Sequence, residues 1–103
     1  MNKYETLILL SPELASEERQ EVLDTLTGVV TRENGKMIEV DDWGVRDLAY
    51  PVRKQVRGYY VRLVYAGPGK LVSELERIIR INDGIFKFLS VKLDEGVESE
   101  EAV

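Results

Sequence analysis

The order of hydrophobic patterns along the chain limits its fold more than any other feature of the sequence. Alternating or continuous apolar residues predict strands, whereas apolar residues three or four positions apart predict amphipathic helices. These patterns predict, in chain order, a strand over 3–10, a helix over 16–30, a strand over 36–52 broken at Gly44, a strand over 59–66, a helix over about 71–80 and a strand over 85–93. The order predicts an α+β, ferredoxin-like βαββαβ domain, in which a four-stranded antiparallel sheet carries both helices on one face.

Connection rules predict the order of the strands in this sheet. Right-handed crossovers favour the first and third strands in the middle of the sheet. Pro51 has no N–H to donate to a ladder, so the strand that contains it is expected at an edge. The polar residues 53–58 are expected to form the loop that joins the second and third strands.

Chain length and composition predict one domain and a tail. A chain of 103 residues has room for one ordinary domain, which we place at residues 1–93. Residues 94–103 contain five acidic residues and no basic residue, and are expected to be a flexible acidic tail. The apolar run at residues 7–10 is too short for a signal peptide or a membrane span, so we expect a cytoplasmic protein without a membrane partner.

The sequence lacks the residues on which most catalytic and metal sites depend. It contains no cysteine and no histidine, which excludes thiolate and imidazole ligands and the commonest general base. It also contains no phosphate-binding glycine loop, nucleophile elbow or zinc spacing. We therefore expect no enzymatic activity, catalytic residue, metal, cofactor or small-molecule substrate.

The charge of the chain is divided unevenly along its length. Residues 1–43 carry a net charge of −6, residues 44–93 carry +6, and residues 94–103 carry −5. The overall charge of −5 therefore hides a basic half, which suggests a surface that faces an anion such as RNA. Arg53, Lys54 and Arg57 crowd the predicted hairpin loop, where their side chains could lie along phosphates.

Two helices can cover only one face of a four-stranded sheet. Strand alternation predicts that the other face is more apolar and aromatic than exposure to water requires, which implies a protein partner. The residues predicted to meet this partner are Leu7, Leu9, Tyr60, Arg62, Phe86 and Phe88.

Specific residues resemble one known family. Over residues 1–93 the chain resembles the bacterial small-subunit (30S) ribosomal protein S-six family. The resemblance is carried by Lys3-Tyr4-Glu5, Ser11-Pro12, Asp42-Trp43-Gly44, Arg46, Leu48-Ala49-Tyr50-Pro51, Lys54, Gly58-Tyr59, Arg80-Ile81, Asp83 and Phe88-Leu89.

The resemblance implies a structural component of the small ribosomal subunit that binds 16S rRNA together with small-subunit protein S-eighteen. A basic residue often found in the family is missing at Asn82, and another is missing at Phe86. The residues that match the family's RNA-facing positions are Lys3, Arg46, Lys54, Arg77, Arg80 and, in the last strand, Lys87.

Two other functions are consistent with parts of the sequence. Residues 57–64 have some likeness to the third strand of RNA-recognition modules, in which aromatic side chains stack on bases, so a stand-alone RNA-binding protein is one alternative. A small ferredoxin-like enzyme, such as an acylphosphatase or a nucleotide-transfer protein, is the other. The missing histidine and phosphate loop argue against an enzyme.

Overall fold

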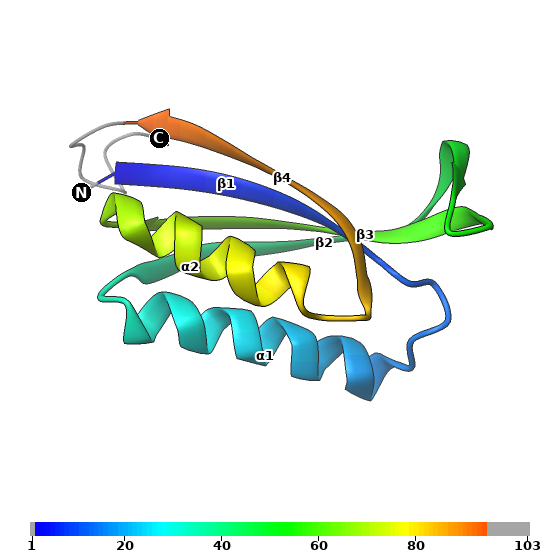
Figure 1. Ribbon diagram of the computed structural model, residues 1–103, viewed down its shortest axis with the longest axis horizontal. Helices are drawn as coiled ribbons and strands as arrows, with labels where there is room; N and C mark the ends of the chain where they lie inside the picture. Colours follow the sequence, from blue (N-terminus) through cyan, green and yellow to red (C-terminus); the bar gives the residue numbers. More distant parts are fainter. Residues whose placement is uncertain (1, 95–103) are drawn as a thin grey trace.

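The computed structural model describes residues 2–94 and contains every predicted element in the predicted order (Figure 1). The expected acidic tail lies outside these residues except for Asp94, which ends the last strand. The elements are β1 (Asn2–Leu10), α1 (Ser16–Arg32), β2 (Lys36–Val52), β3 (Gln55–Gly67), α2 (Gly69–Arg80) and β4 (Ile85–Asp94).

The strands form one antiparallel sheet in the order β2-β3-β1-β4. This order confirms the prediction that the first and third strands occupy the middle, and that the strand with Pro51 lies at an edge. Both helices lie on the same side of the sheet, below it in Figure 1. The fold is therefore the predicted ferredoxin-like one, with one covered face and one open face.

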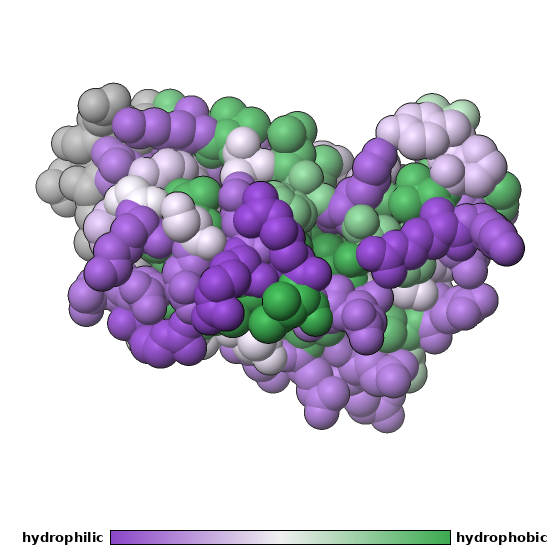
Figure 2. Space-filling view, viewed as in Figure 1, coloured by the Kyte–Doolittle hydropathy of each residue, from purple (hydrophilic) through white to green (hydrophobic). Residues whose placement is uncertain are grey.

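Each helix buries one apolar stripe against the sheet. Leu71, Leu75 and Ile79 of α2 are spaced four residues apart and are fully buried, while the outer surface of the helical layer is mostly hydrophilic (Figure 2). At the start of α1 the backbone N–H of Ala15 donates to the Glu18 carboxylate at 2.8 Å. This bond fixes the first turn.

The core lies between the helices and the face of β1, β3 and β4 that they cover. Ile8 and Leu10 of β1 and Leu63 of β3 are at most 1% exposed. A chain of hydroxyls runs through this layer, with Thr6 Oγ1 2.8 Å from Tyr65 OH and 2.9 Å from Ser90 Oγ. Each of these hydroxyls has a hydrogen-bond partner, so burying it leaves no polar group unsatisfied.

The β2–β3 hairpin is longer than predicted. The expected loop over residues 53–58 is wrong, because Val52 pairs with Gln55 and only Arg53 and Lys54 form the turn. Both turn residues have positive φ angles, 50° and 66°, which two-residue hairpin turns require and non-glycine residues seldom adopt. Two-residue hairpin turns are usually predicted from Asn-Gly, and Arg53-Lys54 does not match that pattern.

Two of the three register shifts in β2 shape the hairpin. The predicted break at Gly44 is confirmed, since its φ is +79° and the register shifts between Asp42 and Gly44. A second shift leaves residues 48–51 without regular partners, because Asp47 pairs with Arg57 and Val52 pairs with Gln55. Bulges bend strands. The tip of the hairpin accordingly turns upward in Figure 1, away from the helices.

A bulge in β4 overturns one prediction about the open face. Leu9 pairs with Lys87 but Leu10 pairs with Ile85, so Phe86 is an extra residue in β4. The extra residue reverses the strand's alternation. Phe88 consequently pairs with Ile8 and packs against the core, and the prediction that Phe88 lies on the open face is wrong.

Candidate nucleic-acid interface

The predicted cationic residues fall into three places in the fold. Lys3 lies near the start of β1 and is only 9% exposed, far along the strand from the hairpin end. Arg77 and Arg80 occupy the last turn of α2. The remaining residues lie along the hairpin or on the neighbouring part of β4: Arg46, Arg53, Lys54, Arg57 and Lys87.

Three cations near the hairpin lie against aromatic rings. The guanidinium carbon of Arg53 is 5.0 Å from the centre of the Phe86 ring, and that of Arg46 is 5.7 Å from the Trp43 ring. Lys87 Nζ lies 4.8 Å from the centre of the Tyr50 ring and donates to its hydroxyl at 2.6 Å. Such contacts attract a cation without neutralising its charge.

Four of the predicted cations along the hairpin and on β4 have no carboxylate partner in the described part of the chain. They are Arg46, Arg53, Lys54 and Lys87. The effect of Lys87 is visible on Tyr50, whose phenol pKa is lowered by the hydrogen bond and the charge of Lys87. The hairpin end of the molecule therefore presents positive charge that a polyanion could neutralise.

Three other predicted cations are already paired with carboxylates. Arg57 forms an ion pair of 3.1 Å with Asp47, which faces it across the hairpin. Arg77 pairs with Glu74 at 2.7 Å, and this bond lowers the pKa of the Glu74 carboxyl. Arg80 forms a longer ion pair, of 3.6 Å, with Glu76, so its charge is less completely neutralised than that of Arg57 or Arg77.

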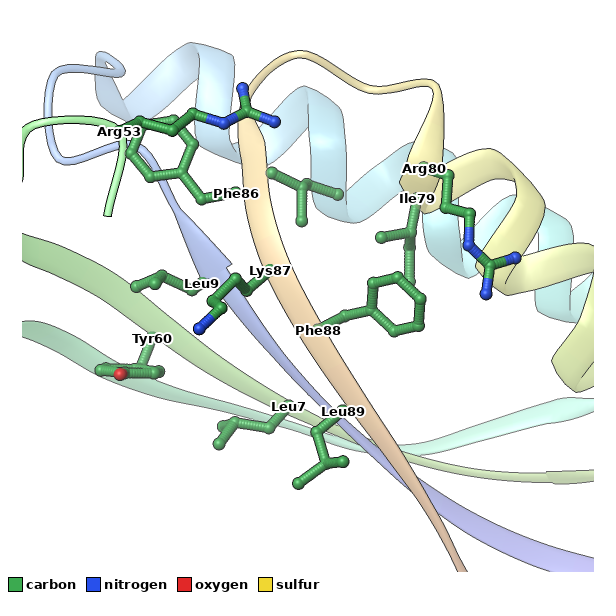
Figure 3. Close-up of a pocket in the computed structure, with 11 residues that line it drawn as sticks. Leu7, Leu9, Arg53, Tyr60, Ile79, Arg80, Phe86, Lys87, Phe88 and Leu89 are labelled. Carbon is green, nitrogen blue, oxygen red and sulfur yellow. The ribbon is translucent and has the colours of Figure 1, made fainter. Parts of the chain in front are cut away.

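A depression extends along both sides of the edge strand β4, and two of the unpaired cations, Arg53 and Lys87, line it (Figure 3). Leu7, Leu9 and Tyr60 line it from β1 and β3, and Leu89 lines it from β4. Arg53 and Phe86 lie together at one end, while Phe88 and Arg80 lie on the opposite side of β4. The depression thus combines an apolar floor with a cationic rim.

Arg62 lies on the open face in a different environment. Its guanidinium forms ion pairs with Glu5 and Glu39, and its side chain is 26% exposed. The hydrogen bond to Glu5 raises the pKa of Arg62 above its usual value. Glu5 and Glu39 thus neutralise the charge of Arg62, whereas the unpaired cations near the hairpin have no such partner among the described residues.

Comparisons with known proteins identify the family. A model of the family described as "Ribosomal protein S6" matches residues 3–92. The small ribosomal subunit protein bS6 of Nitratidesulfovibrio vulgaris strain DP4 is 68% identical over 98 residues, which cover 95% of this chain and 97% of the relative. The bS6 protein of Desulfovibrio desulfuricans is 64% identical and covers 99% of this chain and 100% of the relative. The chain belongs to the ribosomal protein S6 family.

A solved structure agrees with the S6 fold. The crystal structure of 30S ribosomal protein S6 from Thermotoga maritima has a TM-score of 0.84 and 24% sequence identity, and the match covers 89% of this chain and 87% of that chain. The resemblance read from the sequence is confirmed. This S6-family chain is a small-subunit ribosomal protein and, as predicted, a component of the cytoplasmic ribosome. No helix in residues 2–94 is long and apolar enough to cross a membrane.

Sequence reasoning missed several residues of this S6 surface. Tyr50 is 60% exposed and Leu89 is 63% exposed, yet neither was predicted as a site residue. Trp43 contacts Tyr60 with 6.3 Å between ring centres, which adds it to the open face. Trp43 and Tyr50 each lie at an irregular part of β2, and Leu89 follows the bulge at Phe86 in β4, so simple alternation could not place them.

Proposed function

We propose that this S6-family chain is a non-catalytic, structural component of the small ribosomal subunit that binds 16S rRNA together with S18, the S-eighteen protein expected from the resemblance. The observation that carries the RNA part is the group of four unpaired cations at the hairpin end: Arg46, Arg53, Lys54 and Lys87. We call this group the hairpin cations.

The hairpin cations suit the RNA backbone because phosphate contacts gain free energy from the release of counterions. Arginine can also bind phosphate oxygens through two parallel hydrogen bonds. An arginine already paired with a carboxylate must break that pair first, so Arg57 and Arg77 are weaker candidates than Arg46 and Arg53.

The open face supports the protein part of the proposal. Leu7 and Tyr60 are half-buried there, and Leu89 and Val91 are 63% and 44% exposed. Exposed apolar residues grouped on one face are typical of a protein interface. We propose that S18 binds these apolar residues of the open face. Leu89 and Val91 then make the contact from β4 that was expected of Phe88.

The proposal is tested by measuring binding to a 16S rRNA fragment that contains a multi-helix junction, with and without S18, over a range of salt concentrations. We expect binding that S18 strengthens and salt weakens. Arg46→Gln and Lys54→Gln should each weaken it and reduce the salt slope by about 1, as expected for one lost phosphate contact.

Arg57→Gln is the matched control, because it removes a hairpin arginine whose charge Asp47 already neutralises. It should change affinity and salt slope less than Arg46→Gln does. Wild-type salt slopes in both Arg46→Gln and Lys54→Gln would show that these cations do not contact the RNA.

One observation supports a second candidate, a stand-alone binder of single-stranded RNA. Tyr60 and Trp43 form an aromatic pair on the open sheet face, and bases stack on such rings in RNA-recognition modules. Tight binding of a short single-stranded RNA in the absence of S18 would favour this candidate. Preference for the junction, increased by S18, would favour the ribosomal role.

A further inference from the structure

The hairpin tip and β4 are held together by two contacts between residues far apart in the sequence. Arg53 at the turn lies over the ring of Phe86 at 5.0 Å. Tyr50 in β2 accepts a hydrogen bond of 2.6 Å from Lys87. The two contacts lie next to each other, since Phe86 and Lys87 are neighbours in the chain.

Irregular backbone on both sides makes these contacts possible. The unpaired stretch at residues 48–51 lifts Tyr50 out of the β2–β3 ladder, and the bulge in β4 sets Phe86 apart from its partners on β1. Arg53 additionally has a φ of 50°, an unfavourable angle for a residue with a side chain. Backbone strain of this kind is concentrated at functional sites.

Stability of the fold does not account for this arrangement. Tyr50 is 60% exposed, and an exposed contact between a cation and a ring stabilises a protein only weakly. The contacts also bring Arg53 and Lys87 to one depression although neither has a carboxylate partner among the described residues. A cation without a carboxylate partner is available to an RNA phosphate.

We propose that Tyr50 and Phe86 are positioning residues that hold Lys87 and Arg53 as a clamp on the RNA backbone, in which each cation contacts a separate phosphate. This inference rests on the proposed function of RNA binding. The clamp orders the hairpin tip before RNA arrives, so less conformational entropy is lost on binding. Arg53 and Lys87 make the contact, whereas Tyr50 and Phe86 act through them.

The test uses the full chain with the variants Phe86→Leu and Tyr50→Phe. Phe86→Leu removes the ring under Arg53, and Tyr50→Phe removes the hydroxyl that Lys87 binds. The matched control is Tyr4→Phe, because it also removes a hydroxyl that accepts one hydrogen bond, from Asn2, at the end of β1 far from the hairpin tip. Phe86→Tyr keeps a ring at the same place and serves as the rescue variant.

Two measurements are made on each variant: amide hydrogen exchange of residues 50–56 without RNA, and affinity for the junction RNA in the presence of S18 across salt concentrations. Phe86→Leu should speed exchange at the tip and weaken binding about twofold to fivefold. Tyr50→Phe should weaken binding about twofold to tenfold. Tyr4→Phe and Phe86→Tyr should resemble the wild type in both measurements.

The outcomes separate this inference from the proposed function. If the wild-type chain does not bind the junction RNA, both the proposed function and the clamp are refuted. A wild type that binds, with Phe86→Leu and Tyr50→Phe binding equally well at every salt concentration, overturns the clamp alone. Weakened binding with unchanged exchange at the tip would also overturn it, because the positioning role requires the free tip to loosen.

Discussion

Phe88 pairs with Ile8 across the β1–β4 ladder, and its ring therefore packs on the helical side of the sheet. The guanidinium of Arg80 lies 5.2 Å from the centre of that ring. Leu89, the next residue, pairs with Leu7 and points to the open face. One residue step in β4 thus separates a side chain that stabilises the core from one that is available to a partner.

Phe88→Asp and Leu89→Asp should consequently have opposite effects. The first places a carboxylate against the core and should lower the free energy of unfolding by about 3 kcal/mol. The second should change stability by no more than about 0.5 kcal/mol and weaken binding of S18. Urea denaturation and a pull-down with S18 measure the two effects. Equal destabilisation by both variants would contradict the placement of Leu89.

The sequence was sufficient for those parts of the fold that follow regular periodicity. Both helices, all four strands, the strand order and the family could be predicted from apolar spacing, Pro51 and the motif residues. The errors arose where backbone irregularity changes alternation. The extra residue Phe86 reversed the faces of β4, and the Arg53-Lys54 turn replaced an expected six-residue loop.

Periodicity also carries no information on which cations are free. Arg57 and Arg53 are separated by four positions in one basic segment, but only Arg57 faces a carboxylate, because β2 and β3 align it with Asp47. This distinction depends on the register of the hairpin. A prediction that assigns both arginines to a loop over residues 53–58 contains no register and cannot make this distinction.

The strained turn gives a prediction that separates stability from binding. Replacing Arg53-Lys54 with Asn-Gly supplies residues that adopt positive φ readily. We expect the double variant to be more stable than the wild type by about 1–2 kcal/mol and to bind the junction RNA more weakly. Denaturant unfolding and RNA titration test the two parts. A variant that is less stable would show that the side chains of Arg53 and Lys54 stabilise the fold more than their backbone angles cost.

Two glycine-to-alanine substitutions should have opposite effects on the free energy of unfolding. Gly28 lies in α1, and a Cβ added there meets nothing within 4 Å, so Gly28→Ala should stabilise the protein by about 1 kcal/mol. A Cβ at Gly58 would overlap the Cδ1 atom of Leu9, which is 4% exposed. Gly58→Ala should destabilise by about 1–3 kcal/mol. Thermal unfolding of both variants checks the pair.

Tyr65 predicts how stability depends on alkaline pH. Its hydroxyl is buried beside Thr6, and burial raises the pKa of the phenol above the ordinary value of 10.0. Below pH 10.0 both states keep the proton; above it the unfolded state loses the proton while the folded state retains it. Stability should therefore fall as pH rises from this point toward the folded-state pKa, by up to about 1.4 kcal/mol per pH unit.

Tyr65→Phe isolates this contribution. At neutral pH the variant should be less stable by about 1 kcal/mol, because the hydrogen bond to Thr6 is lost. Above pH 10.0 its stability should decline less steeply than that of the wild type, so the two curves converge. Tyr59, whose pKa is raised mainly by its hydrogen bond to Asp42, is present in both proteins and its effect cancels in the difference. Urea denaturation from pH 8 to about pH 11 gives both curves, and parallel curves would contradict a raised pKa at Tyr65.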